Sequence, residues 1–161
     1  MLEESRRVLE IVSFFNSFVM EKSQVKLDSS AFIAEPELFE ALAKRSTPVD
    51  CAEERVLFRQ GELPQGLYLL RCGYATMTME SPTGDVVICT TAAAGSLLGL
   101  PGLIGNEPYS LSAKAMKGAE VGFVTLDEFS KLMLTEPAMS VKVLRVLAAE
   151  VRTARRAVTS L

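Results

Sequence analysis

The side chains best suited to chemistry in this sequence are three cysteines and a scatter of carboxylates, and the chain contains no histidine. Histidine is the commonest protein ligand for metals, a frequent general base and the usual pH switch. Its absence excludes serine–histidine and cysteine–histidine catalysis, histidine-ligated haem and most zinc hydrolase sites. We therefore expect no metal site and no catalytic residues of these kinds.

The carboxylates that come nearest to acid–base candidates are Glu107, Asp127 and Glu128. General acid–base catalysis needs groups that converge on one reacting atom, and these fall in a predicted loop and at a predicted helix start. Glu128 is better explained by Thr125-Leu126-Asp127-Glu128, a pattern typical of a capping box at the start of a helix. The sequence therefore predicts a protein that is not an enzyme.

The cysteines, Cys51, Cys72 and Cys89, are odd in number and lack the spacing of a zinc or disulfide motif. An iron–sulfur cluster needs four ligands close together, which three scattered cysteines do not supply. Buried thiols that pack as small hydrophobic groups are the simpler interpretation. A reducing, cytoplasmic location follows from it.

The composition describes one ordinary globular domain without a strong charge bias. The chain has 161 residues, a net charge of −3, 48% hydrophobic and 23% charged residues. A protein with this balance is not a general nucleic-acid binder. The apolar stretch from Val8 to Met20 is interrupted by Glu10 and Asn16 and is shorter than the ~20 residues of a membrane-spanning helix. We expect no membrane contact.

Residues 1–34 are predicted to be an amphipathic helix, from Met1 to about Leu27, and a linker that begins at Asp28. Apolar residues recur at intervals of three and four residues along this helix. They are Val8, Ile11, Val12, Phe15, Phe18 and Val19. This face must be covered, and we expect it to lie on the body of the domain; contact with another chain is the alternative. Glu35-Pro36 then opens a short second helix.

Short runs of β-branched and aromatic residues, separated by turn residues, predict a β-rich core between Thr47 and Thr125. The predicted strands are 48–51, 56–58, 66–71, 74–80, 86–91, 109–116 and 121–125, with a hairpin loop at 81–85. Two helices follow, one from Leu126 to about Thr135 and one that starts at Glu136-Pro137.

The last helix, about 137–158, carries an apolar stripe with the alternating three and four spacing of a two-stranded coiled coil. The stripe consists of Leu144, Leu147, Val151, Ala154 and Val158. We expect it to be the interface of a homodimer. The alternative is that the stripe packs on the β core.

Several of these segments resemble the cyclic-nucleotide-binding domains of the cAMP receptor protein and FNR (CRP/FNR) family, in particular their sensor half. The resemblance rests on Phe58-Arg59-Gln60-Gly61-Glu62, Leu67-Tyr68-Leu69-Leu70, Gly73, Gly95-Ser96-Leu97-Leu98-Gly99 and Ala119-Glu120-Val121. It implies an α+β fold: a β-roll (a double-stranded β-helix or jelly roll), flanked by N-terminal helices and a long C-terminal dimerisation helix. Residues 35–161 form this domain.

The resemblance also locates a phosphate-binding cassette, and this chain departs from the family there. The family supplies a glutamate for the ribose and an arginine for the phosphate; these positions are Leu100 and Tyr109 here. Lys114 is expected on the opposite strand face, so it is no substitute. The backbone amides of Gly99 and Leu100, together with the Ser110 hydroxyl, offer at most a weak anion nest. Loss of both groups costs about 3 to 6 kcal/mol, so cAMP and cGMP are expected to bind weakly or not at all.

The same resemblance gives a candidate ligand pocket of Leu98, Gly99, Leu100, Tyr109, Ser110 and Leu111. Such a lining suits a small apolar or aromatic effector with Ser110 as its polar anchor. Alternatively these side chains pack against one another and leave a scaffold without a ligand.

In the family the long helix leads to a helix-turn-helix domain, whereas this chain stops at Leu161, so we expect no direct DNA binding. The last helix is locally basic, with a single acidic residue, Glu150, among its cations. We interpret these cations as a solvated helix face; they are Lys142, Arg145, Arg152, Arg155 and Arg156. The sequence thus predicts a non-catalytic regulatory or sensor module that acts through homodimerisation, a non-nucleotide effector or a protein partner. The alternative is a genuine cyclic-nucleotide sensor with an unorthodox phosphate site.

Overall fold

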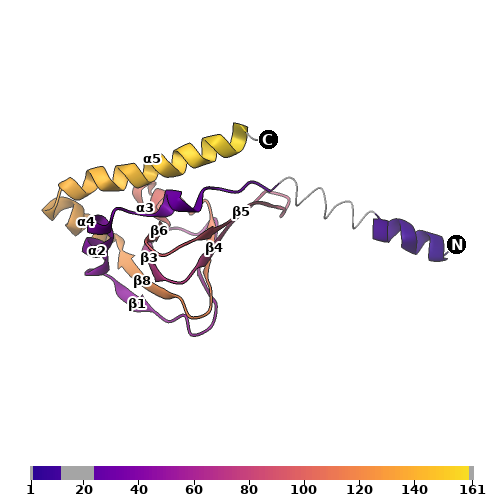
Figure 1. The fold of residues 1–161 in the computed structure, drawn as a ribbon, viewed down its shortest axis with the longest axis horizontal. Coiled ribbons are helices and arrows are strands. Elements are labelled where there is room, and N and C mark those ends of the chain that lie inside the picture. The colour runs from indigo at the N-terminus through magenta and orange to yellow at the C-terminus, as the bar shows by residue number, and fades with distance from the viewer. Residues whose placement is uncertain (1, 12–23, 160–161) are drawn as a thin grey trace.

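Two four-stranded antiparallel sheets face each other and form a β-roll (Figure 1). The structure is a computed structural model that describes residues 2–11 and 24–159. One sheet contains, in spatial order, β1 (Thr47–Val49), β8 (Glu120–Thr125), β3 (Gly66–Cys72) and β6 (Ser96–Leu98). The other contains β2 (Arg55–Phe58), β7 (Ser112–Ala115), β4 (Ala75–Glu80) and β5 (Val86–Ala92).

Strand alternation divides the buried side chains between two cores. Leu67 and Leu69 of β3 point out of the roll into a core shared with the helices, while Tyr68 and Leu70 point into the roll. The outer core is built from α2 (Pro36–Ala43), α4 (Leu126–Thr135) and α5 (Ala138–Thr159) packed on this sheet. The roll therefore has its own interior, separate from the packing that holds the helices.

Helix starts follow the sequence signals. α2 begins at Pro36, and α4 begins at Leu126, where the Thr125 hydroxyl accepts a hydrogen bond from Glu128 N at 3.1 Å. The Glu128 carboxylate itself pairs with Arg45 at 3.1 Å. The predicted cap at Thr125 is confirmed, whereas the Glu128 side chain, which a capping box would direct back to Thr125, instead ties α4 to Arg45 at the end of α2.

The C-terminal half of α5 lies over the roll and is held there by the segment before α2. Asp28 N donates to Thr153 Oγ1 at 2.7 Å, and Asp28 also caps the short 3₁₀ helix η1 (Ser29–Phe32). Near the start of α5, the Glu35 carboxylate forms ion pairs with Arg145 at 3.1 Å and with Lys142 at 3.5 Å. These contacts fix α5 relative to the rest of the domain.

The prediction of one helix from Met1 to Leu27 is wrong at its C-terminal end. Residues 2–11 are helical, but Val25 is extended and its backbone forms a bridge with β5, with Val25 N donating to Val87 O at 2.8 Å. Val8 and Ile11 are exposed, so the expectation that this face lies on the body is wrong for them. Val12, Phe15, Phe18 and Val19 lie outside the described residues.

Strand β6 and helix α3 (Leu100–Gly105) were not predicted, and two of the seven predicted strands differ from the observed ones by more than one residue at an end. β1 ends at Val49 rather than Cys51, and the strand expected over 109–116 begins only at Ser112. Gly95 and Gly99 have positive φ and leave room for only three strand residues between them. Such a short strand and a six-residue helix that contains Pro and Gly give no periodic signal.

Within 2–11 and 24–159, none of the helices combines the length and the hydropathy that a bilayer crossing requires.

Candidate functional site

The six residues of the predicted pocket surround the β6–α3 turn and the loop before β7, but they do not all face the same space. Leu98 is buried inside the roll, whereas Leu100 points into the outer core beside the helices. Gly99, Tyr109, Ser110 and Leu111 do line one small cavity in the roll. The structure therefore brings four of the six together and places Leu98 and Leu100 in packing positions.

Tyr109 fills the position at which the resemblance expects a phosphate-binding arginine. Its ring stacks on Phe58 with centroids 4.0 Å apart, and its hydroxyl donates to Gly66 O at 2.8 Å. Gly99 has φ 93°, and a Cβ there would lie only 2.8 Å from Tyr109 Cε1, so the turn and the ring fit only without a side chain. Burial raises the pKa of Tyr109 to about 12, which keeps the phenol neutral.

The cavity that remains inside the roll measures about 20 Å³. This volume holds about one water molecule. A nucleotide-sized ligand has no room there unless Tyr109 moves.

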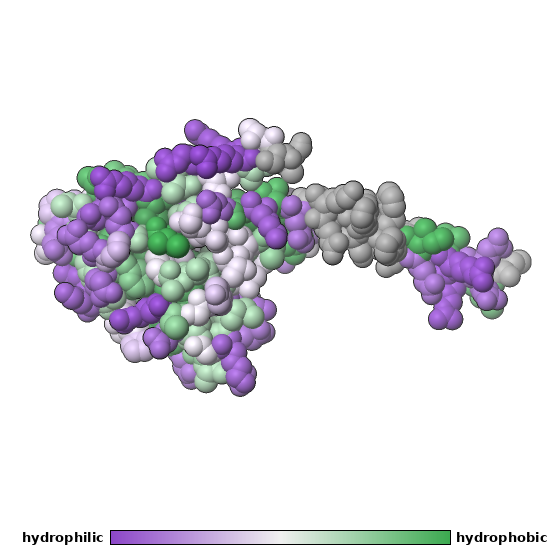
Figure 2. All heavy atoms as spheres, viewed as in Figure 1, coloured by the Kyte–Doolittle hydropathy of each residue, from purple (hydrophilic) through white to green (hydrophobic). Residues whose placement is uncertain are grey.

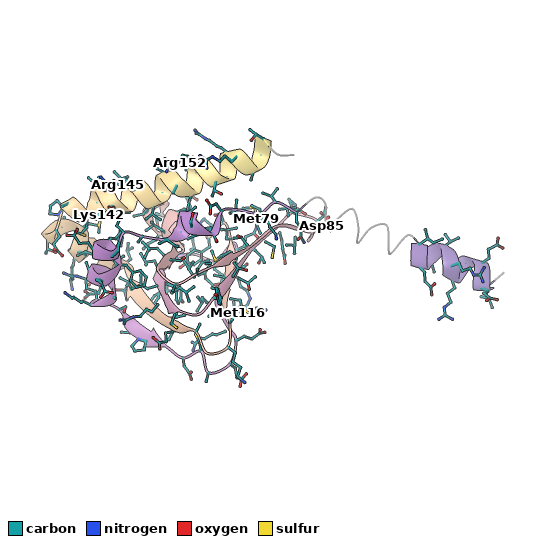
Figure 3. The ribbon with its side chains drawn as sticks, viewed as in Figure 1. Met79, Asp85, Met116, Lys142, Arg145 and Arg152 are labelled. Carbon is teal, nitrogen blue, oxygen red and sulfur yellow. The ribbon has the colours of Figure 1, made fainter. Side chains whose placement is uncertain are left out.

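A larger cavity, which we call the α5 cavity, lies between the C-terminal half of α5 and the β4–β5 hairpin. Its volume is about 540 Å³. The walls come from α5 (Leu147, Glu150, Val151, Thr153, Ala154, Ala157, Val158), from the β4–β5 hairpin (Met79, Val87, Ile88), from 25–32 (Val25, Leu27, Phe32) and from Pro101, Ser110 and Leu111. Figure 3 shows Met79 under α5, while Arg152 projects away from the roll. Apolar atoms are visible below this part of α5 in Figure 2.

Glu150 is the one acidic side chain in the walls of both cavities. Its Oε2 atom is buried, and within the described residues it has no hydrogen-bond partner. Burial raises the pKa of Glu150 to about 8, so this carboxyl is protonated at neutral pH. The solvated face expected for the basic residues of α5 does not include Glu150, which lies one helical turn from Val146 and Thr153, both buried. That spacing was the signal available in the sequence.

The predicted coiled-coil stripe lies along the mouth of the α5 cavity. Leu144 is 61% exposed and Val158 67%, and Val151 and Ala154 are also exposed. Leu147 is half-buried against the outer core. Four of the five stripe residues, all except Leu144, also line the cavity. A second chain seated on the stripe would therefore also form a wall of the cavity.

The other candidate groups are separate from this site. Lys114 pairs with Glu54 at 3.6 Å on the outer face of the sheet, and Lys142 and Arg145 pair with Glu35. Cys51 is buried, which raises its pKa, and Cys72 is exposed. Among residues 2–11 and 24–159, no group of three or more acidic or cysteine side chains has the arrangement of a metal site.

A β-roll closed by a long C-terminal helix is the architecture of CRP-like sensor domains, and the comparisons agree. Catabolite activator protein of Thermus thermophilus superposes with a TM-score of 0.67 at 22% identity, covering 75% of this chain and 57% of that protein. The sequence model of the cyclic nucleotide-binding domain matches residues 48–136. The chain belongs to the cyclic nucleotide-binding domain family and is of the CRP/FNR type.

Two curated proteins are similar to this chain in sequence. The transcriptional activator protein Anr of Pseudomonas protegens is 26% identical over 126 residues, 78% of this chain and 50% of Anr. A CRP-like cAMP-activated global transcriptional regulator of Mycobacterium tuberculosis is 25% identical over 118 residues, 73% of this chain and 53% of the regulator. The chain spans about half the length of these relatives.

Replacement of the buried phenol tests whether the Tyr109 hydroxyl stabilises the packing that fills the cassette. Tyr109→Phe keeps the stack on Phe58 and leaves the Gly66 carbonyl without its donor. We expect the free energy of unfolding to fall by about 1 to 2 kcal/mol in urea titrations. The control is Tyr74→Phe, because Tyr74 is 60% exposed and should change stability little. Equal stabilities for Tyr109→Phe and the wild type would contradict this role for the hydroxyl.

The buried carboxyl predicts a pH dependence of stability. The pKa of Glu150 rises from 4.5 to about 8, so the unfolded chain loses this proton at a lower pH than the folded protein. The contribution of the protonated Glu150 to the free energy of unfolding is therefore fully present below about pH 4.5 and is lost as the pH rises to about 8. Between about pH 5 and pH 8 the free energy of unfolding should fall by about 3 kcal/mol on this account.

Glu150→Gln should flatten this fall, whereas Glu40→Gln, at an exposed site, should leave it unchanged. Urea titrations at several pH values measure both. A wild type whose stability rises over that range, or a Glu150→Gln variant with the wild-type slope, would contradict the burial of this carboxyl.

Proposed function

We propose that this domain is a non-catalytic sensor module whose effector is a small, largely apolar molecule rather than a cyclic nucleotide, and that the effector binds in the α5 cavity. The observation that carries the proposal is the contrast between the two spaces. The cassette in the roll is reduced to about 20 Å³ by Tyr109, while an apolar cavity of about 540 Å³ is open beside it. Pockets of this size and lining suit drug-sized apolar ligands.

The charges around the site support the exclusion of a cyclic phosphate. Removing a phosphodiester from water is costly unless a cation and several N–H donors meet it. Among the described residues, neither cavity has a lysine or arginine in its walls, and Glu150 adds a carboxyl. The family's ribose and phosphate positions are Leu100 and Tyr109, both used in packing.

Homodimerisation through α5 belongs to the same proposal. Leu144, Val151 and Val158 expose apolar surface in a single chain, and burying it against a second copy is favourable. Because stripe residues also line the cavity, an effector and a second chain would contact the same side chains. A bound ligand would then shift the equilibrium between two positions of α5 against the roll. The size of this shift is limited by the difference in the ligand's affinity for the two positions.

The output of the module belongs to this proposal as well. The curated relatives are transcriptional regulators, and we propose a regulatory role for this chain, carried by a protein partner and exerted in the cytoplasm. No step of this role requires catalysis.

The second candidate is a receptor for a cyclic nucleotide, favoured by the family itself and by the cAMP-activated relative. It requires Tyr109 to leave its stack on Phe58 and Ser110 with the amides near Gly99 to hold the phosphate. Breaking this packing and burying a phosphate without a cation both cost free energy, so the cyclic-nucleotide receptor is the weaker candidate.

The proposal is tested with N-phenyl-1-naphthylamine, an uncharged dye whose fluorescence rises in apolar sites. We expect saturable binding to the wild type. Ala157→Phe places a ring in the α5 cavity and should weaken binding at least about tenfold. Ala52→Phe, at an exposed loop site, is the control. No saturable binding, or equal binding by Ala157→Phe, would contradict the cavity as the effector site.

Light scattering in the same titration tests the link to dimerisation. We expect a dimer at micromolar concentration whose stability changes when the dye is bound. A monomer at that concentration, with or without dye, would contradict the role of the α5 stripe.

A further inference from the structure

Among the described residues, the α5 cavity has one buried side-chain polar atom without a hydrogen-bond partner, Glu150 Oε2. We propose that the Glu150 carboxyl selects effectors with an apolar body and a protonated amine. This inference rests on the proposed function, because it names the ligand class of the same cavity. It goes beyond it by assigning the specificity to one residue. The amine would donate to Glu150 at the inner end of the cavity, and the apolar body would lie along α5.

The position of Glu150 supports this role. The residue lies in the walls of both the α5 cavity and the small cavity in the roll, at their junction. Its Oε2 atom has no hydrogen-bond partner among the described residues and no contact with solvent. Buried polar atoms in native proteins are nearly always satisfied, so an orphaned carboxyl oxygen at a cavity wall marks a position for a donor.

The groups that face Glu150 supply no other charge. From the roll these are Tyr109, whose hydroxyl is bound to Gly66 O, and Ser110. On α5 the neighbouring polar side chain is Thr153, whose hydroxyl accepts from Asp28 N. The Asp28 carboxylate is bound to Ser30 and interacts with the charge of Arg156.

The remaining walls, from α3, β4 and β5, are apolar at this cavity. They contribute Pro101, Met79, Val87 and Ile88. Within the described residues, Glu150 is thus the sole charged group that a ligand in the cavity would meet.

The chemistry of this carboxyl separates three ligand classes. A protonated amine gives a charge-assisted hydrogen bond to an ionised Glu150, which is about twice as strong as a neutral one. A neutral alcohol gives an ordinary hydrogen bond, worth less. A carboxylate or phosphate gains no cation and meets a group that becomes negative when it ionises, so anions are excluded.

Binding of an amine must also depend on pH. The unliganded Glu150 holds its proton at neutral pH, and an amine cation displaces that proton when it pairs with the carboxylate. At pH values below the pKa of Glu150, the affinity for the amine should therefore rise about tenfold for each unit by which the pH is increased. A neutral ligand displaces no proton, so its affinity should not depend on pH in this range.

The test uses three probes with the same indole body: tryptamine, tryptophol and indole-3-acetate. Each displaces bound N-phenyl-1-naphthylamine from the wild type, from Glu150→Gln and from Glu136→Gln as an exposed control. In the wild type we expect tryptamine to displace the dye at a concentration about tenfold below that of tryptophol, with indole-3-acetate weakest. Tryptamine affinity should rise with pH between about pH 6 and pH 7.5, and tryptophol affinity should not.

Glu150→Gln should bring tryptamine and tryptophol to similar affinities and abolish the pH dependence, while Glu136→Gln behaves as the wild type. The proposal is overturned if the dye binds but the amine has no advantage over the alcohol, or if the advantage survives in Glu150→Gln. Failure of the dye itself to bind overturns the cavity, and the amine assignment with it. The two failures are therefore distinguishable.

Discussion

The stack of Tyr109 on Phe58, closed by the hydrogen bond from the phenol to Gly66 O, determines what the inside of the roll can hold. In this fold the space beside the β6–α3 turn is where the resemblance places the phosphate cassette. Here an aromatic pair occupies it, and Gly99 has the conformation and the absence of a side chain that let the ring lie against the turn. The larger of the two cavities beside this turn lies outside the aromatic pair, between the roll and α5.

Contacts near both ends of α5 fix its position. The helix is fixed at its start by Glu35 and toward its end by the Asp28–Thr153 hydrogen bond, while the side chains between these points cover the opening of the roll. One of those side chains is Glu150. Burial of a carboxyl without a partner destabilises the folded state, so this residue lowers stability in the absence of a ligand. A donor that pairs with it would recover that free energy on binding, which couples ligand recognition to the contact between α5 and the roll.

Much of the fold could be predicted from the sequence because its signals are local. The runs around Leu67 and Met77 have strand alternation, Thr125 caps α4 through its own side chain, and the 22 residues of α5 have a continuous helical period. The substitution of Leu100 and Tyr109 for the family's polar groups was also visible. Strand β6 and helix α3 are too short for any period, and Val25 takes its non-helical conformation from pairing with β5, far along the chain.

The site was less predictable because it depends on which face of each element meets another. Leu98 and Leu100 are two residues apart in sequence, yet the left-handed turn at Gly99 sends them into different cores. Glu150 is a charged residue type, typical of surfaces, but its spacing along α5 places it beside core residues. Because α5 carries several arginines, its composition suggests an exposed face and gives no sign that Glu150 is buried. The walls of the α5 cavity come from segments as far apart as Val25 and Val158, which only the packed structure brings together.

The central claim is that the domain has exchanged the family's phosphate chemistry for an apolar site, and calorimetric titration with cAMP and cGMP at neutral pH tests it most directly. The account predicts no saturable heat up to millimolar nucleotide, because no cation meets the phosphate and Tyr109 fills its place. Saturable binding of either nucleotide with a micromolar Kd would contradict it and would show that the cassette opens to admit the ligand.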